Sequence, residues 1–450
     1  MTDTAGLRET YPAPLNILTS HKLFDNVPDM THGTDGFSQI REPAFVPFAK
    51  HRTPDWAMFR LPGRPLLAVQ VNESAFGRPI LDIATSLQVA RRDNADVYFM
   101  PVSEEASKYR VNKELLTLEC AGTRIVSHAS MRGRIARRLW DLRRHAEPYL
   151  GALSRSRSVQ GQSEWQPTFR RRLFGDAMPA VLSSEQVARS RRALSMAGLS
   201  DDMPIVTLHL RDQSHDAGDN LSQARIEAPS RRNTTVDTYL PAIEYLASKG
   251  FKIVRLGPSH ETAIDHPAII NLSGVGADRP LLEIHALFHS RFFICSDSGP
   301  MLLPLLTGTP SLLTNGTHWA CQYPLKKTDV YLLKSVRDNV TGKTLSVDDM
   351  FGEEFVAQGY TDRYTFLDNT PDDLLHAVQE IESILDGKQE MSSAQTAFKK
   401  KCERLGAVYQ ESDRLPAPVR SVFRKWANDD GFLGNGRIAS AFLNKMSEPD

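Results

Sequence analysis

The sequence lacks several features that would assign the protein to a class immediately. Among 450 residues there are only four cysteines, and they lie far apart, so neither a disulfide framework nor a cysteine-based zinc site is indicated. No apolar run approaches the length of a membrane span, and the first residues lack the basic-then-apolar order of a signal peptide. We therefore expect a cytoplasmic protein with reduced thiols, not an integral membrane protein.

Several catalytic signatures are also missing. The sequence has no P-loop, no nucleophile elbow of a serine hydrolase, and no glycine-rich dinucleotide motif after its first predicted strand. It contains no Asp-x-Asp, with which many nucleotide-sugar transferases hold a divalent metal, and its thirteen histidines have no metal-ligand spacing. We expect neither a metal nor another cofactor. Basic and acidic residues balance at 54 each, so net charge indicates no partner, and a nucleic-acid partner is not predicted.

Apolar strands and amphipathic helices alternate through most of the chain. Strands are predicted at 65–71 and 96–102, with a helix over 80–92 between them. After residue 183 the alternation is strict, which requires parallel strands joined by crossovers. The predicted fold class is therefore α/β, with two Rossmann-like domains facing each other across a cleft.

Changes in composition divide the chain into four parts. They are an irregular N-terminal extension over 1–62, a first Rossmann-like domain with a basic helical connection over 63–182, a second Rossmann-like domain over 183–390, and a helical C-terminal tail over 391–450. The first part is rich in Pro, Gly, Asp and His and shows little periodicity, so we expect it to wrap on the body or to be partly disordered.

The stretch FFICSDSGPMLLPLLTGTP, residues 292–310, places small polar residues between two apolar runs. It predicts a strand, then a helix capped by Ser298 and closed by Gly308, then a strand over 311–314. The loop would lie at the carboxyl end of a strand and the amino end of a helix, where anions bind in α/β sheets. An ordinary capped helix explains these residues equally well.

A second polar group, His-Leu-Arg-Asp, ends the strand predicted over 204–210. His209 and Arg211 are two residues apart and point to one side of the strand, and an arginine there can form bidentate bonds with phosphate oxygens. Taken alone, the group is best interpreted as a packed core histidine followed by two solvated loop charges. With the loop of 292–310 on the same sheet edge it suggests a diphosphate site. The candidate binding residues are Arg211, Arg232, Asn233, Glu283, Ser296, Asp297, Ser298 and Gly299.

Two members of that set have a specific expected role. Glu283, on the helix before the loop, is either an exposed helical charge or a carboxylate that accepts ribose hydroxyls. Arg232, in the run Ser-Arg-Arg-Asn, is either a solvated charge or a second phosphate contact.

Four segments, 205–258, 287–315, 368–378 and 436–445, resemble a family of bacterial glycosyltransferases known largely from surface-polysaccharide gene sets. More remotely, residues 281–310 are similar to the donor-binding segment of heptosyltransferases, with Asp297-Ser298-Gly299 in place of Asp-Thr-Gly. The histidine that usually follows that motif is absent. His-Leu-Arg also resembles the His-x-Arg motif of fucosyltransferases, whose arginine holds the β-phosphate of the donor.

The resemblance implies the two-Rossmann, metal-independent architecture called GT-B. The C-terminal half would bind a nucleotide-sugar donor, and the N-terminal half a glycan or lipid-linked glycan acceptor. His209 and Arg211 would be catalytic. Heptosyltransferases carry an aspartate in their first loop, roughly where Arg78 stands here. Glu73 is the only carboxylate in that loop, so it is the candidate general base, unless it is a surface charge.

We therefore expect a metal-independent hexosyl- or deoxyhexosyltransferase that moves a sugar from a nucleoside diphosphate to an acceptor hydroxyl, in surface-glycan synthesis. Two alternatives remain open. One is a nucleotide-sugar 2-epimerase of the same architecture, and the other is a non-catalytic scaffold with a glycosyltransferase fold.

The segment 132–172 is strongly basic, with eleven arginines, three carboxylates and a net charge of +8. Within it, a helix over 135–150 carries an apolar stripe flanked by arginines, with Trp140 close to the stripe. The stripe consists of Ile135, Leu139, Leu142, Ala146 and Leu150. Such a helix is typical of peripheral contact with an anionic membrane, here the inner face of the cell membrane. The alternative is ordinary packing between the two halves.

Overall fold

The computed structural model describes most of the chain after residue 54. The described residues are 55–446 without 72, 74–76, 105–110, 151–179, 197, 201, 213–230, 258–261, 273–275, 277, 318, 320–325, 359–361, 410 and 416–433. Residues 1–54, the greater part of the predicted extension, therefore lie outside the described residues. The prediction of irregular structure is wrong for the last part of the extension, where strand β1 (Asp55–Phe59) pairs antiparallel with β2 (Leu66–Gln70).

A three-stranded sheet, called the small sheet below, forms the N-terminal part. Its order is β1-β2-β3, and β2 and β3 (Asp96–Phe99) are parallel. They are joined by helix α1 (Gly77–Arg92), so the predicted strand–helix–strand opening is confirmed. Side chains of α1 are buried from Pro79 to Ala90, which makes it a central helix and not a surface one.

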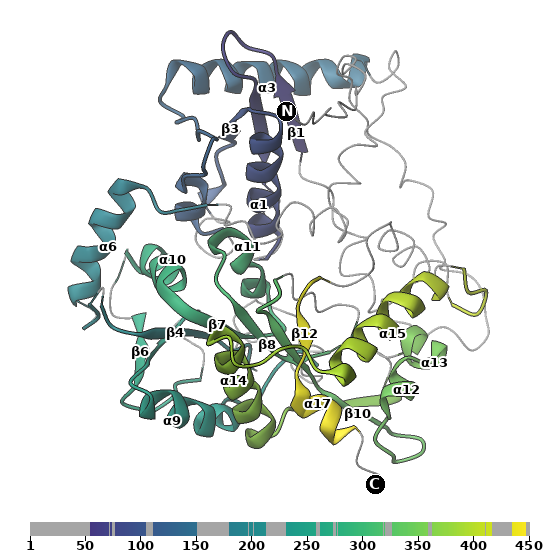
Figure 1. Ribbon diagram of the computed structural model, residues 1–450. Coiled ribbons are helices and arrows are strands. Elements are labelled where there is room, and N and C mark those ends of the chain that lie inside the picture. The colour runs from purple at the N-terminus through teal and green to yellow at the C-terminus, as the bar shows by residue number, and fades with distance from the viewer. Residues whose placement is uncertain are drawn as a thin grey trace, which may run out of the picture.

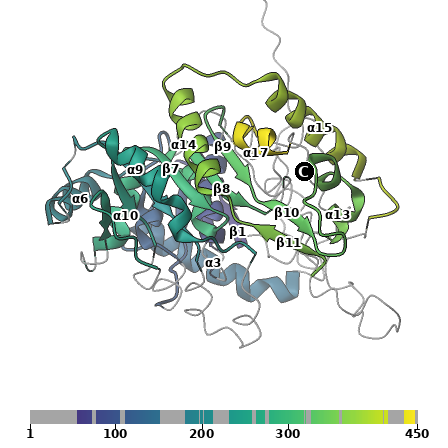
Figure 2. The ribbon, with the colours of Figure 1, turned by 90° about the horizontal axis from the view of Figure 1, so that it is seen from below.

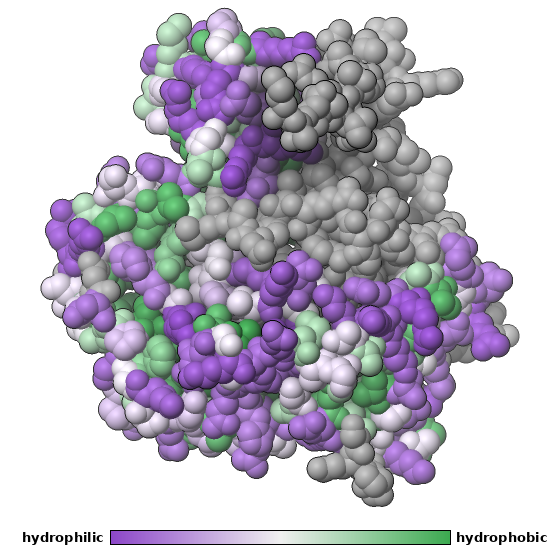
Figure 3. All heavy atoms as spheres, in the orientation of Figure 1, coloured by the Kyte–Doolittle hydropathy of each residue, from purple (hydrophilic) through white to green (hydrophobic). Residues whose placement is uncertain are grey.

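Helix α3 (Met131–Leu150) packs on the small sheet by a different face from the one predicted. Ala136 and Trp140 are buried against Leu66 and Tyr98, and Trp140 is 2% exposed while Leu142 is 65% exposed. The large indole fills the space over the sheet beside the small alanine, so it fixes which face is buried. Trp140 therefore cannot belong to a membrane-facing stripe. Hydrophilic residues cover much of the upper part of the molecule, where α3 and the small sheet lie (Figure 3).

A seven-stranded sheet, called the large sheet below, forms the second part, and every one of its strand pairs is parallel. Its order is β12-β9-β8-β7-β4-β5-β6. The strands are β4 (Ile205–His209), β5 (Lys252–Arg255), β6 (Ile269–Asn271), β7 (Ser290–Ser296), β8 (Ser311–Gly316), β9 (Val330–Leu333) and β12 (Arg437–Ile438). The predicted parallel sheet is thus confirmed.

Helices cover both faces of the large sheet. Figure 1 shows α6 (Ser184–Met196) and α10 (Arg279–His289) on the side of the small sheet. On the opposite side, α9 (Leu240–Ser248), which follows the short turn η2 (Val236–Tyr239), packs against α14 (Pro371–Leu385), as Figure 2 also shows. Thr370 caps α14 with a capping box, as its sequence predicts.

The order of the first six large-sheet strands is that of a doubly wound fold. Numbered along the chain from β4, they run 3-2-1-4-5-6 across the sheet. In such folds the strand order reverses at one point, and ligands bind there, outside the carboxyl ends of the strands. The reversal here lies between β4 and β7.

The segment after β7 differs in detail from the predicted single helix. It forms a short turn η4 (Gly299–Leu302) and then a four-residue helix α11 (Pro304–Thr307). A continuous α-helix would need the nitrogen of Pro304 to donate to the carbonyl of Pro300, and proline has no N–H. Gly308, with φ of 73°, closes α11, as predicted.

Two parts of the fold were not foreseen. Strands β10 (Ser335–Asp338) and β11 (Tyr364–Leu367) form a separate antiparallel pair, with α12 (Val347–Met350) and α13 (Glu353–Gln358) between them. The tail is mostly helical where described, with α15 (Ser393–Tyr409) and α17 (Ser440–Lys445), but it also supplies β12.

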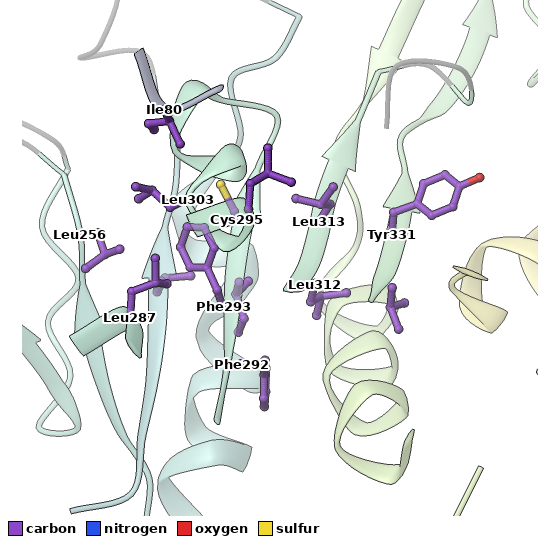
Figure 4. Packing of buried hydrophobic residues seen from close by; sticks show 14 of the residues in the cluster. Ile80, Leu256, Leu287, Phe292, Phe293, Cys295, Leu303, Leu312, Leu313 and Tyr331 are labelled. Carbon is purple, nitrogen blue, oxygen red and sulfur yellow. The ribbon is translucent and has the colours of Figure 1, made fainter. Parts of the chain in front are cut away.

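The two sheets are joined through packed side chains. Helix α1 contacts η4 and α11, and turn η1 (Lys113–Thr117) contacts α10. One buried core continues from the small sheet into the large one, and Figure 4 shows Ile80 of α1 near Leu303. The GT-B arrangement of two domains across a cleft stays a prediction.

Candidate functional site

The predicted site residues gather where the strand order reverses. His209 is the last residue of β4 and lies in register with Cys295 of β7. Ser296 ends β7, and Asp297 and Ser298 follow it directly. Two neighbouring parallel strands thus bring the His-Leu-Arg and Ser-Asp-Ser groups to one edge, as the sequence predicted.

His209 and Ser298 form a buried hydrogen-bonded pair, with 2.9 Å between Nε2 and Oγ. The other ring nitrogen, Nδ1, lies 3.3 Å from the carbonyl oxygen of Leu256. A carbonyl only accepts hydrogen bonds, so Nδ1 carries the hydrogen, and in the neutral ring Nε2 accepts from the Ser298 hydroxyl. Ser298 stands at the N-cap position of η4 but makes no side-chain cap bond, because its hydroxyl is used by His209. Its predicted capping role is therefore wrong.

Arg211 is held by two other predicted residues. Its Nε donates to Asn233 Oδ1 at 3.1 Å, and its backbone N–H donates to Ser296 Oγ at 2.8 Å. Its carbonyl accepts the N–H of Thr234 at 2.9 Å. The side chain is 7% exposed, so this is a desolvated arginine and not the solvated loop charge of the alternative reading. A desolvated guanidinium at a sheet edge attracts an anion more strongly than one in water.

Asp297 and Gly299 complete the loop. The Asp297 carboxylate accepts the hydroxyl of Thr317 at 2.8 Å and is 9% exposed. A carboxylate only accepts hydrogen bonds, so it suits a sugar hydroxyl better than a phosphate. Gly299 begins η4, whose four residues are too few for a sizeable helix dipole. Any anion held here would therefore depend on Arg211 and on individual N–H groups more than on a helix terminus.

Glu283 lies on α10, beside this edge. Its Oε1 accepts the N–H of Gly257 at 3.2 Å and Nε of Arg279 at 3.0 Å. Burial raises the pKa of the Glu283 carboxyl, and the Arg279 guanidinium and the Gly257 N–H offset part of that rise. Glu283 also lines a small cavity between the two sheets, together with Ile80 and Leu303. It is a half-buried carboxylate, with 19% of its side chain exposed, and not an exposed helical charge.

Glu73 and Arg232 have different surroundings. Both carboxylate oxygens of Glu73 accept from Ser103, at 3.1 Å from the backbone nitrogen and 2.6 Å from the hydroxyl. These two residues follow β2 and β3, so Glu73 lies at the carboxyl edge of the small sheet. Arg232 is exposed in the turn before η2. The roles of general base and phosphate contact stay predictions for them.

Sequence reasoning missed a buried polar network on the same edge. Lys334 follows β9, and its Nζ donates to the carbonyl of Asn233 and to Asp368 Oδ1, both at 2.6 Å. Asn315, at the end of β8, has φ of 52°, and its amide donates to the hydroxyl of Tyr239 at 2.8 Å. Burial raises the pKa of Tyr239 to about 12. The sequence did contain a signal for this network. In "VYLLK" and "SLLTN" an apolar run ends in a polar residue, which is Lys334 in the first and Asn315 in the second.

The described part of the chain holds no group of three or more His, Cys, Asp or Glu residues that could ligate a metal ion. Within that same part, no helix is both long enough and apolar enough to cross a membrane.

Comparison with known proteins gave three remote similarities. No family model matches the chain, and no curated protein matches it. Among solved structures it is similar to a glycosyl transferase of family 9 from Veillonella parvula, at 14% identity and a TM-score of 0.24, over 52% of this chain and 63% of that one. It is also similar to the dodecameric iron-containing heptosyltransferase TibC in complex with ADP-D-beta-D-heptose, at 15% identity and a TM-score of 0.25, over 58% and 60%.

A third similar structure is the E. coli heptosyltransferase WaaC with ADP-2-deoxy-2-fluoro heptose, at 14% identity and a TM-score of 0.20, over 53% of this chain and 67% of that one. The chain thus spans less than two thirds of the length of the first two relatives. At these identities and TM-scores no residue correspondence follows, so the proposals below rest on this chain's own residues.

Proposed function

We propose that the protein is a metal-independent glycosyltransferase that moves a sugar from a nucleoside diphosphate to an acceptor hydroxyl. One observation carries the proposal: a desolvated arginine and a buried Ser–His pair meet at the strand reversal of a doubly wound sheet. Arg211 lies on one side of the reversal, after β4, and Ser298 on the other, after β7. A ligand with two phosphates matches the fixed cation of Arg211 at this reversal, and the backbone N–H groups of the loop after Ser296 would supply the further donors.

Each group has a distinct role in the proposed reaction. The bond between the sugar's anomeric carbon and the diphosphate oxygen breaks, the acceptor oxygen bonds to that carbon, and the acceptor's proton passes to a base. Arg211 and the donors of the loop neutralise the charge that develops on the departing diphosphate, which is where preorganised donors lower a barrier most. Asp297 would accept a hydroxyl of the sugar, and Glu283 a hydroxyl of the ribose.

The small sheet would bind the acceptor, a glycan or lipid-linked glycan, in a GT-B arrangement. Glu73 is the proposed base, because it is a carboxylate at the carboxyl edge of that sheet and is held in place by Ser103. Surface-glycan synthesis places such an enzyme in the cytoplasm, in peripheral contact with the inner face of the membrane. The exposed arginines of α3 support that contact.

A nucleotide screen tests the proposal directly. The full chain is heated with UDP, GDP, CMP, dTDP, ADP and their sugar conjugates, and the melting temperature is recorded. A ligand at one hundred times its dissociation constant adds about 2.7 kcal/mol of stability, which is readily seen. The expected result is stabilisation by one base class, by the diphosphate more than by the nucleoside. Absence of stabilisation by every nucleotide would favour the non-catalytic scaffold.

A product assay separates transfer from isomerisation. The donor that binds is incubated with the protein, with and without candidate glycan acceptors, and analysed by NMR. A glycosyltransferase releases nucleoside diphosphate in an acceptor-dependent way. Conversion of the donor to its 2-epimer without an acceptor would instead support the epimerase, and would overturn the proposed reaction while leaving the nucleotide site intact.

A further inference from the structure

Lys334 is a buried cation close to the proposed diphosphate site. Its side chain is 2% exposed, and its Nζ donates to the carbonyl of Asn233 and to Asp368 Oδ1, both at 2.6 Å. Burying an ammonium group is costly unless a counter-charge and hydrogen-bond acceptors compensate it. Asp368 supplies the counter-charge. The bond from Lys334 to the carbonyl of Asn233 then holds the backbone of Asn233 at the end of β9.

The segment 233–235 is fastened at two further points. Both the N–H and the hydroxyl of Thr235 donate to Asp368 Oδ2, each at 2.7 Å, so one carboxylate holds Lys334 with one oxygen and Thr235 with the other. Burial acts to raise the pKa of Asp368, but the Lys334 charge and the hydrogen bonds from Lys334 and Thr235 outweigh it, and the pKa lies below its ordinary value. The carboxylate therefore stays charged when the segment is held.

Asn233 passes this constraint on to Arg211. Its side-chain oxygen accepts Nε of Arg211 at 3.1 Å. A guanidinium group is planar and includes Nε, so a bond at Nε restricts how the two outer nitrogens can face a ligand. Recognition of phosphate by arginine depends on that orientation, because the bidentate contact needs both outer nitrogens in one plane with the phosphate oxygens.

We propose that Lys334, together with Asp368, is a positioning residue that sets the orientation of the Arg211 guanidinium through Asn233. The nature of the anion that Arg211 then meets rests on the proposed function. The positioning itself does not, and it can be measured without any ligand.

The first experiment follows the Arg211 Nε–H group by NMR in protein labelled with 15N-arginine. The signal is assigned by its loss in Arg211→Ala, and its hydrogen-exchange rate is compared between the parent and Lys334→Met. Exchange about tenfold faster or more in Lys334→Met is expected, since couplings within a hydrogen-bonded network reach that size. An unchanged exchange rate would overturn the proposal, whatever nucleotide the protein binds.

A matched control separates positioning from a general loss of stability. Lys326 is also a largely buried lysine, and its Nζ donates to the carbonyls of Gly308, at 2.5 Å, and of Thr309, before β8. Lys326→Met therefore removes a comparable cation from the opposite edge of the large sheet. It should leave the Arg211 signal unchanged. Asp368→Asn is the second test variant if Lys334→Met does not fold, and the same acceleration is expected.

The second experiment measures ligand affinity by calorimetry. Lys334→Met should bind the nucleoside diphosphate about tenfold more weakly than the parent, and the free nucleoside equally well. In the Arg211→Lys background, which should retain weak but measurable binding, the same change should add nothing, because the two residues act in series. An equal further loss in that background would show that Lys334 acts independently of Arg211. If the parent binds no nucleotide, the proposed function fails, and the exchange measurement alone decides the positioning.

Discussion

His209 and Glu283 bond to the two sides of a single peptide group. His209 Nδ1 lies 3.3 Å from the carbonyl oxygen of Leu256, and Glu283 Oε1 accepts the N–H of Gly257 at 3.2 Å. That carbonyl and that N–H belong to the same peptide unit, directly after β5. The unit thereby connects strand β4 with helix α10, and it fixes which ring nitrogen of His209 faces Ser298.

Gly257→Ala should disturb that peptide. Gly257 has φ of 119°, which side chains with a Cβ rarely adopt, so alanine there costs on the order of 1–3 kcal/mol or shifts the backbone. We expect a lower free energy of unfolding by denaturant and weaker nucleotide binding by calorimetry. The control is Gly250→Ala, at φ of 86° in the turn after α9, which should lose stability only. Parent-like nucleotide affinity in Gly257→Ala would contradict the assigned role of the peptide.

Arg211→Ala should abolish measurable binding of the nucleoside diphosphate and leave the fold intact. Arg211→Lys should also bind poorly, because an ammonium cannot reproduce the planar bidentate contact or the bond to Asn233. Circular dichroism checks the fold and calorimetry the affinity. Arg291→Ala is the control, since it removes an exposed arginine paired with Asp386 at 2.6 Å. If Arg211→Ala binds like the parent, the residue does not belong to the site.

Activity should survive chelation. The sequence has no Asp-x-Asp, and the proposed site relies on Arg211 and on backbone N–H donors to neutralise the diphosphate. We expect the same rate of nucleoside diphosphate release in the presence of EDTA and after added magnesium or manganese. Loss of turnover with EDTA and its return with either metal would show that the metal-independent assignment is wrong.

Glu283 should make stability depend on pH. Burial raises its folded-state pKa above the ordinary value, with Arg279 and Gly257 opposing. Between the ordinary and the raised pKa the folded state holds a proton that the unfolded state has released, so stability falls as pH rises through that window. In Glu283→Gln this fall should be absent. In Arg279→Met, which lacks the opposing cation, the window should extend to higher pH. Denaturant titrations at successive pH values measure both, and identical pH profiles for parent and Glu283→Gln would refute the expectation.

Helix α3 should bind anionic vesicles through charge more than through an aromatic anchor. Its Trp140 is buried, with the Arg143 guanidinium 5.1 Å from the ring centre. Exposed Arg134, Arg138 and Arg144 remain available to head groups. We expect sedimentation with phosphatidylglycerol vesicles at low salt and release at high salt.

Reversing those three arginines to Glu should release the protein from vesicles without changing nucleotide affinity. The control reverses three exposed cations elsewhere, at Arg192, Lys249 and Arg337, with the same change in net charge. Failure of the parent to bind anionic vesicles at low salt would remove the membrane contact and leave α3 as an ordinary packed helix.

The large sheet and much of its site could be predicted because the signals are local. A strand such as β7 is a compact apolar run, and the polar residues that follow it must lie at a sheet edge. Because strands and helices alternate, β4 and β7 run parallel, and their carboxyl ends lie at the same edge of the sheet. His209, Arg211 and Ser298 therefore lie together, as the sequence predicted.

The parts that were missed depend on contacts between distant segments. Lys334 looks like any charge at a strand end until the fold brings it to Asn233 and Asp368. The buried face of α3 depends on which side chain packs best on the small sheet. Trp140 is buried there in preference to the aliphatic stripe because its indole buries the larger apolar area. Ser298 could cap a turn or bond to His209, and only the neighbouring strand decides between them.

The pairing of β12 with β9 has a consequence for how the chain folds. Arg437 and Ile438 lie beside Val330 and Tyr331, although they are made long after them. Until then β9 is an outer strand with open N–H and C=O groups, which can pair with the same strand of another copy. Such late, long-range pairing is slow, so the growing chain can aggregate through β9 until β12 has emerged from the ribosome and paired with it.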